Sequence, residues 1–160
     1  MTQEDKELLL KDLCGRLPYG VIGQCGIDAS YDTSFDTIFQ IHKFDAVVYG
    51  IKEDLLLVTP LIEDKDEQEF ANEEVADGVD ILDFKPYLFP ISSMTEEQKN
   101  EFDARTVEIM FGEVVCKKND EIGYGKLMAF DLDFYNKHHL DWRGLIPMGL
   151  AEDATGLNIY

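Results

Sequence analysis

The sequence predicts an α+β fold: a single domain with an antiparallel or barrel-like β-sheet packed by an N-terminal helix and two shorter helices. Three observations predict this class. The 160 residues suffice for one compact core but not for two. A leucine stripe of helical period opens the chain, and residues 19–62 then alternate apolar and polar side chains. These alternating segments are close in sequence, so they pair most simply as an antiparallel meander.

Residues 1–18 form the predicted N-terminal helix. Leu9, Leu13 and Leu17 recur every four residues, which is one apolar stripe of an amphipathic helix. Acidic residues in its first turn favour the positive end of the helix dipole. Pro18 closes the helix, because a proline cannot continue its hydrogen-bonded ladder.

Residues 19–62 form the predicted β-meander. Its predicted strands cover residues 19–24, 35–41, 45–51 and 55–62. Lys52, Glu53 and Asp54 separate the last two strands, and their number and polarity suit a hairpin turn. We therefore expect these strands to be neighbours in one sheet.

Residues 63–80 are the most acidic segment, with nine acidic residues and one basic residue in eighteen positions. Phe70 and Val75 are its main apolar anchors. The pattern is compatible with a mobile loop or with a short helix that ends near Gly78.

Residues 81–160 form a predicted mixed α/β region with an irregular C-terminal tail. Residues 81–88 are expected to be extended, because Pro86 resists helix formation. Thr95 and Gln98 fit a capping box, which predicts a helix from Glu96 to about Arg105.

Two more strands and one more helix are predicted beyond residue 105. Alternating apolar residues predict a strand over Val107–Cys116, and a second strand is predicted over Lys126–Phe130. Residues 117–120 between them are expected to form a turn. Asp131 can cap a short helix that runs through His139. The tail beyond this helix is rich in glycine and proline and is expected to be irregular.

The charge of the chain excludes several classes of partner. It has 33 acidic and 14 basic residues, for a net charge of −19. Direct binding to nucleic acid or to an anionic membrane is not expected, because both need clustered Lys and Arg. The longest nearly apolar run, Leu55–Ile62, is too short to cross a bilayer. With a polar, acidic N-terminus unlike a secretion signal, the sequence predicts a cytoplasmic protein.

No catalytic, cofactor or metal site is predicted. The chain has no Cys-x-x-Cys pair and no phosphate-binding glycine motif. Its three cysteines are expected to be reduced thiols. A catalytic pair of Cys25 or Cys116 with His42 stays open, although a small buried hydrophobe is the commoner role for such a cysteine. His138 and His139 are adjacent, so they point to different sides of a helix or strand and rarely chelate one ion.

The acidic segment supplies most of the candidate partner-binding residues. These carboxylates are Glu63, Asp64, Asp66, Glu67, Glu69, Glu73, Glu74, Asp77 and Asp80. One interpretation is nucleic-acid mimicry, in which carboxylates imitate phosphates and occupy the basic groove of a DNA-handling enzyme. The alternative is an acidic face that is only solvated.

Trp142 and Arg143 are the other candidate partner-binding residues. Trp142 is the only tryptophan, and aromatic and arginine residues are favoured anchors at interfaces. The competing interpretation, which we favour, is that Trp142 seals the core together with Leu145, Ile146 and Leu150.

Three stretches of the chain resemble a known group of proteins. They are residues 13–21, from Leu13-Cys14-Gly15-Arg16 to Val21; residues 85–97, beginning Lys85-Pro86-Tyr87; and residues 138–151, which include Asp141-Trp142-Arg143-Gly144. These three stretches, and the order in which they follow one another along the chain, resemble small proteins of gut anaerobic bacteria, their phages and mobile elements. That group has no known activity, so the resemblance implies a bacterial host cytoplasm and assigns no functional residue.

The sequence therefore predicts a non-enzymatic binding or accessory protein of the phage or mobile-element type, which acts through protein–protein contacts. The first alternative is an acidic DNA mimic that inhibits a host nucleic-acid-handling or defence enzyme. The second is a small enzyme whose site is assembled from scattered residues. A protein partner is expected, and no cofactor.

Overall fold

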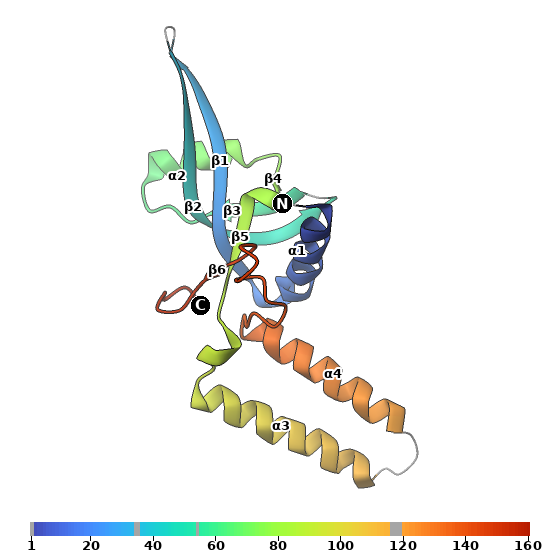
Figure 1. Ribbon diagram of the computed structural model, residues 1–160. Helices are drawn as coiled ribbons and strands as arrows, with labels where there is room; N and C mark the ends of the chain where they lie inside the picture. The colour runs from blue at the N-terminus through green and yellow to red at the C-terminus, as the bar shows by residue number, and fades with distance from the viewer. Residues whose placement is uncertain (1, 34–35, 54, 116–119) are drawn as a thin grey trace.

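A curled, mixed six-stranded sheet in the form of a half-barrel, with four α-helices, makes up the described part of the chain and confirms the predicted α+β class (Figure 1). The computed structural model describes residues 2–33, 36–53, 55–115 and 120–160. Within these ranges, residues 27–33, 36–42, 110–115 and 120–124 are described by their backbone alone. The helices are α1 (Gln3–Arg16), α2 (Lys65–Glu74), α3 (Glu96–Val115) and α4 (Asp120–Lys137). The strands are β1 (Val21–Thr33), β2 (Asp36–Lys52), β3 (Leu55–Pro60), β4 (Val79–Asp80), β5 (Phe84–Leu88) and β6 (Glu152–Asp153).

The sheet has the strand order β4-β3-β2-β1-β5-β6. Strands β1, β2 and β3 are antiparallel neighbours in chain order, and the predicted strands 35–41 and 45–51 are one continuous strand, β2. β5 returns to the free edge of β1 and pairs with it antiparallel. The C-terminal strand β6 then pairs parallel to β5, so the sheet is mixed.

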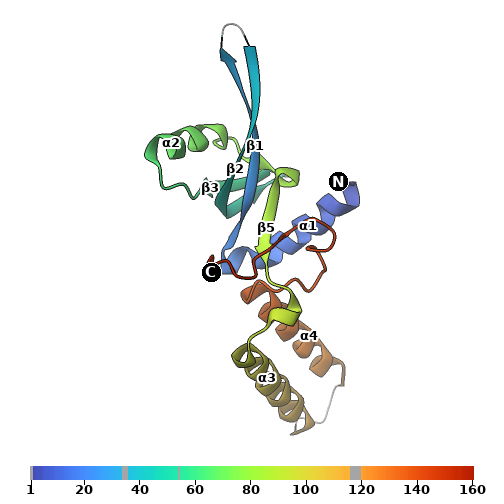
Figure 2. The same ribbon diagram turned by 60° about the vertical axis from the view of Figure 1, so that its left-hand side comes forward.

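A two-stranded ribbon extends beyond the body of the sheet. β1 and β2 pair from Val21↔Val48 to Thr33↔Asp36. The neighbouring strands cover only the base of this pair, since β5 meets β1 at residues 23–25 and β3 meets β2 at residues 46–52. The rest of the pair projects from the body as a ribbon (Figures 1 and 2).

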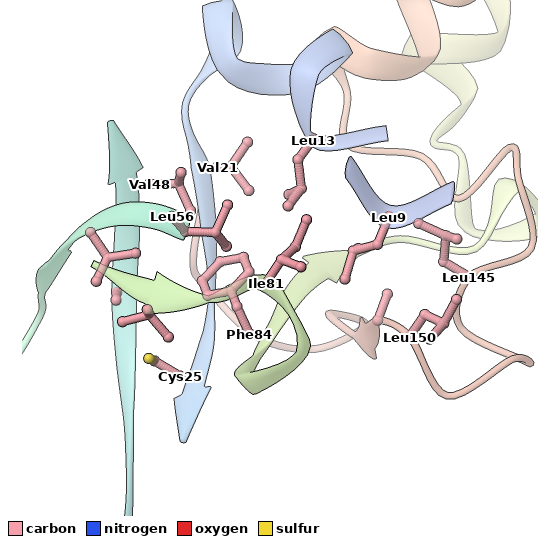
Figure 3. Close-up of a cluster of buried hydrophobic side chains, with 14 of the residues drawn as sticks. Leu9, Leu13, Val21, Cys25, Val48, Leu56, Ile81, Phe84, Leu145 and Leu150 are labelled. Atoms are coloured by element: carbon pink, nitrogen blue, oxygen red, sulfur yellow. The ribbon is translucent and has the colours of Figure 1, made fainter. Parts of the chain in front are cut away.

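Helix α1 packs its leucine stripe against the sheet. Thr2 caps it in a capping box with Asp5, as Thr2 Oγ1 accepts from Asp5 N and Asp5 accepts from Thr2 N. Leu9 and Leu13 are fully buried and point toward Ile81 just before β5 (Figure 3). Below α1 the core is completed by Val21, Val48, Leu56, Phe84, Leu145 and Leu150.

The two strands predicted beyond residue 105 are wrong. The described part of Val107–Cys116 belongs to α3, and Lys126–Phe130 belongs to α4. Cys116 and the predicted turn residues 117–119 lie outside the described residues. α3 begins at Glu96 as predicted, but it does not end near Arg105.

The physical reason is the contact between the two helices. Phe102 of α3 stacks on Phe130 and meets the edge of Phe134 of α4, with ring centroids 5.6 and 5.0 Å apart. Phe130 and Phe134 are four residues apart, a helical spacing that a short strand pattern hides. The predicted short helix from Asp131 through His139 is likewise the last part of α4, which ends at Lys137. With 20 and 18 residues, α3 and α4 are longer than the 14-residue α1, so the expectation of two shorter helices fails for them.

Candidate functional site

The acidic segment folds as a helix, the second of the two predicted alternatives. Asp64 caps α2, and its Oδ1 accepts from Asp66 N at 3.0 Å and from Glu67 N at 3.1 Å. Beyond the helix, Gly78 adopts a φ of 100°, a conformation that favours glycine, and leads into β4. The negative segment is therefore an ordered part of the structure.

Helix α2 turns its few apolar residues toward the sheet. Ala71 and Val75 are buried. Gln68 fixes the helix to the end of β3, because its side chain donates to the Pro60 carbonyl at 2.9 Å and accepts from Ile62 N at 3.0 Å. With this side attached, the carboxylates are left on the solvent side of the helix.

The carboxylates of the segment are exposed and largely unpaired. Eight of the nine are exposed: Glu63, Asp64, Asp66, Glu67, Glu69, Glu73, Glu74 and Asp77. The described part of the chain shows no ion pair for these eight. Asp80 differs, because it is half-buried, lies 3.6 Å from Lys6 Nζ and accepts from Leu82 N at 2.9 Å. The eight form a negative surface, which we call the α2 surface.

Trp142 and Arg143 do not join the α2 surface. The Trp142 indole N–H donates to Asn136 of α4 at 3.1 Å, and the Arg143 guanidinium lies 3.9 Å above the Trp142 ring. Arg143 Nε is 3.3 Å from Asp12 Oδ1 of α1. Both residues are half-buried. Their contacts join the segment after α4 to helices α1 and α4.

A buried ion pair that was not predicted from the sequence lies at the same place. Arg16 and Asp12 are both shielded from solvent, and the Arg16 guanidinium contacts the carboxylate with Nε at 2.6 Å and Nη2 at 3.1 Å. Nη2 also donates to the Leu140 carbonyl at 2.8 Å. A signal was present, since positions 12 and 16 share one helical stripe with Leu9 and Leu13.

His139 and Tyr160 form a second contact, in which His139 is buried and Tyr160 is 46 % exposed. Their rings are parallel to within 11°, with centroids 3.7 Å apart. The Tyr160 hydroxyl lies 3.0 Å from the Tyr87 carbonyl oxygen and accepts from Ile22 N at 3.3 Å. Burial, together with the nearby Arg16, lowers the pKa of His139 to about 4, so its imidazole is neutral at pH 7. The pair holds the C-terminus against β1 and β5.

Cys25 has the environment of an inert thiol. It is fully buried in the core, and burial together with the nearby Asp83 raises its pKa to about 12. The thiolate is the nucleophilic form, so Cys25 is not activated for catalysis at neutral pH. The side chain of His42 and the whole of Cys116, its possible partners in a catalytic pair, lie outside the described residues.

The described residues form neither a cluster of metal ligands nor a membrane-spanning helix. There, no group of three or more His, Cys, Asp or Glu side chains is arranged to hold a metal ion. Within the same residues, no helix combines the length and the apolar character needed to span a membrane.

The chain matches no protein-family model, no curated protein and no solved structure. The resemblance to small proteins of gut bacteria and their phages thus stays a prediction. The fold and its surface define an α+β domain that displays a short acidic helix.

Proposed function

We propose that this chain is a non-enzymatic binding protein that acts through protein–protein contacts and recognises a basic surface of its partner. The observation that supports the proposal is the α2 surface, whose eight exposed carboxylates have no ion pair in the described part of the chain. Like charges held so close repel one another and destabilise the folded state. A partner rich in Lys and Arg would relieve this repulsion, and the negative field would speed its approach.

The partner in this proposal is a protein, because a net charge of −19 repels the phosphate backbone of nucleic acids. The proposed setting is the cytoplasm of a bacterial host, where a phage or mobile element would use the chain as an accessory protein. This setting is supported by the resemblance of residues 13–21, 85–97 and 138–151 to proteins of such elements.

The charge density of α2 favours DNA mimicry as the second candidate. The helix has five carboxylates in ten residues, or roughly one per 3 Å at the rise of an α-helix. Duplex DNA has about one charge per 1.7 Å of its axis. The helix thus reaches about half the charge density of DNA over less than one DNA turn. It can stand in for a few phosphates in the basic groove of a nucleic-acid-handling enzyme.

A pull-down from bacterial lysate at low and then moderate salt tests the proposal. The test variant neutralises four exposed carboxylates of α2: Glu67→Gln, Glu69→Gln, Glu73→Gln and Glu74→Gln. The matched control neutralises four exposed carboxylates of other helices: Glu4→Gln, Glu7→Gln, Glu97→Gln and Asp103→Asn. Both variants change the net charge equally, so only the position of the lost charges differs.

We expect a basic protein that the wild-type chain captures at low salt and releases as salt is added, because salt screens exposed charges. The control variant should retain this partner and the α2 variant should lose it. A partner retained by the α2 variant would contradict the proposal. Competition by duplex DNA for the captured protein would favour mimicry over a contact elsewhere on the partner.

A further inference from the structure

Tyr160 lies where two neighbouring strands of the sheet part. β1 and β5 pair as far as Gly23↔Pro86. In an uninterrupted antiparallel ladder, Ile22 and Tyr87 would be the next pair. The ladder ends before them, and the end of the tail lies at this point, beside the start of β1 (Figure 2).

The Tyr160 hydroxyl joins the backbones of these two strands. It accepts from Ile22 N at 3.3 Å, and it lies 3.2 Å from the Ile22 carbonyl oxygen and 3.0 Å from the Tyr87 carbonyl oxygen. A hydroxyl has one hydrogen to donate and two lone pairs with which to accept, so it can bind Ile22 N while it donates to one of the two carbonyls. The hydroxyl therefore takes the place of a direct contact between the strands.

The ring of Tyr160 is held by two other rings. It stacks on His139, which is 4 % exposed, at a centroid distance of 3.7 Å. Phe89 meets it in a tilted arrangement at 6.1 Å, and both geometries are favourable for aromatic pairs. We call Ile22, Tyr87, Phe89 and His139 the tyrosine site. Its residues come from β1, from the end of β5 and from the segment after α4, so the tail contributes none of them.

The segment that carries Tyr160 has few attachments of its own. Ala154 N still donates to β5, at 2.8 Å from the Leu88 carbonyl oxygen. Residues 155–158 beyond it are exposed. In the described structure, the one backbone–backbone hydrogen bond of residues 155–160 stays within the tail, from Leu157 N to the Ala154 carbonyl. Residues 155–160 are therefore a strap whose polar anchor to the sheet is the hydroxyl of its tyrosine.

The contacts at this site are made by a side chain and not by the backbone that supplies it. We propose that the tyrosine site binds a tyrosine from an extended segment of a partner protein, and that the strap occupies the site in cis until that segment displaces it. A partner tyrosine makes the same contacts once the strap has left. The strap competes with it at an effective concentration in the millimolar range, as expected for a short tether.

The hydroxyl contacts define which side chain the site accepts. A phenylalanine would stack on His139 equally well, but it would leave Ile22 N without the oxygen that accepts from it. A site built to bind a hydroxyl discriminates against the analogue that lacks one, because its own polar groups then lose their partner. An aliphatic side chain would lose the ring contacts as well. The site therefore selects tyrosine.

An NMR titration with a peptide of residues 154–160, blocked at both ends, tests the inference. The test variant Tyr160→Ala empties the site. The matched control Leu157→Ala removes another side chain of the strap, one that is 48 % exposed. We expect saturable binding to Tyr160→Ala that shifts the signals of the Ile22 amide and the His139 imidazole. The wild type and the control should bind at least about tenfold more weakly, because their own Tyr160 competes.

A second peptide that contains Tyr160→Phe tests the hydroxyl. It should bind the Tyr160→Ala protein at least about tenfold more weakly than the first peptide does. Equal affinity of the two peptides would overturn the inference. So would the absence of saturable binding to a Tyr160→Ala protein whose circular dichroism is that of the wild type, or a Leu157→Ala control that binds as tightly as Tyr160→Ala.

A milder variant keeps the test valid if Tyr160→Ala does not fold. Tyr160→Phe in the protein retains the ring on His139 and loses only the hydroxyl, so it should bind the first peptide more tightly than the wild type does. No gain over the wild type would also overturn the inference.

This inference does not rest on the proposed function, since it concerns other residues and another partner. Adding the four α2 substitutions of the pull-down to Tyr160→Ala should leave its affinity for the peptide unchanged. A loss of binding there would assign the peptide to the α2 surface and overturn the tyrosine site. Failure of the pull-down leaves the titration unaffected, so the two failures are distinguishable.

Discussion

Asp12 and Arg16 form an ion pair that is fully shielded from solvent, with two contacts of 2.6 and 3.1 Å between guanidinium and carboxylate. The pair lies where α1 meets the end of α4, because Arg16 also donates to the carbonyl of Tyr135 in α4 at 3.4 Å and to that of Leu140 just beyond it at 2.8 Å. A charged pair on the leucine stripe of α1 therefore connects the N-terminal helix to the end of α4. The partners depend on each other, since a single buried charge is far more costly than a buried pair.

The first prediction concerns this dependence. Arg16→Met should lower the free energy of unfolding by about 3–5 kcal/mol, because it leaves the Asp12 carboxylate buried without its main partner. The double variant Asp12→Leu, Arg16→Met should lose less than Arg16→Met alone, since no charge then remains buried. Urea unfolding of the two variants and the wild type measures both differences. If the double variant were the less stable of the two, the pair would not have the role assigned to it.

The sequence predicted the parts of the fold whose period is unambiguous. The stripe of Leu9 and Leu13 in α1 is long enough to identify a helix, and the alternation before residue 62 identifies strands. The class followed from these elements. The exposure of the α2 carboxylates was also predictable, because a segment with nine acidic residues in eighteen cannot be buried.

The sequence could not predict what long-range contacts decide. Val107–Cys116 alternates over too few positions to separate a strand from a helix, and the ring of Phe102 against Phe130 and Phe134 favours the helix. The stacking of Tyr160 on His139 joins residues 21 positions apart through the irregular tail, for which no periodic signal exists. The contact of Arg143 with Asp12 likewise depends on the packed structure.

The second prediction compares two glycines. A Cβ atom at Gly23 of β1 would lie 2.3 Å from the Lys85 carbonyl oxygen and 2.8 Å from Pro86 Cα, so backbone would have to move. At Gly125 of α4 it would meet no atom within 4 Å. Gly23→Ala should therefore lower the melting temperature by several degrees. Gly125→Ala should raise it, because alanine favours helix over glycine by about 1 kcal/mol. Thermal unfolding followed by circular dichroism gives both signs, and equal shifts in one direction would contradict the β1–β5 packing.

The third prediction concerns Asp131 of α4. Its Oδ1 is buried without a hydrogen-bond partner in the described structure, and burial raises the pKa of its carboxyl group. The folded state therefore disfavours the charged form at pH 7. Asp131→Asn should raise the free energy of unfolding at pH 7 by up to about 1 kcal/mol. The exposed Asp103→Asn is the control and should have little effect. Because the pKa is raised in the folded state, the Asp131 carboxyl of the folded wild type is protonated at a higher pH than that of the unfolded chain. The gain in unfolding free energy of the Asp131→Asn variant over the wild type should therefore shrink as the pH falls through the folded-state pKa. A variant less stable than the wild type at pH 7 would argue for an essential charge at this position.

The fourth prediction uses the buried imidazole of His139. Its folded-state pKa of about 4 lies below the ordinary value of 6.5, so between these values the unfolded chain binds a proton that the folded chain does not. Stability from this residue is therefore present above pH 6.5 and is lost as the pH falls toward 4. The full loss is on the order of 3 kcal/mol.

The variant His139→Asn isolates this contribution. Asparagine tolerates the positive φ of 52° at this position but does not titrate. The stability difference between wild type and variant should therefore grow in favour of the wild type from pH 4 to 6.5, while the titrating carboxylates that both proteins share cancel. Urea unfolding at several pH values measures this difference, and NMR titration of the wild-type imidazole gives its pKa directly. A difference that does not change with pH would mean that His139 is accessible to solvent and that the ring of Tyr160 does not cover it.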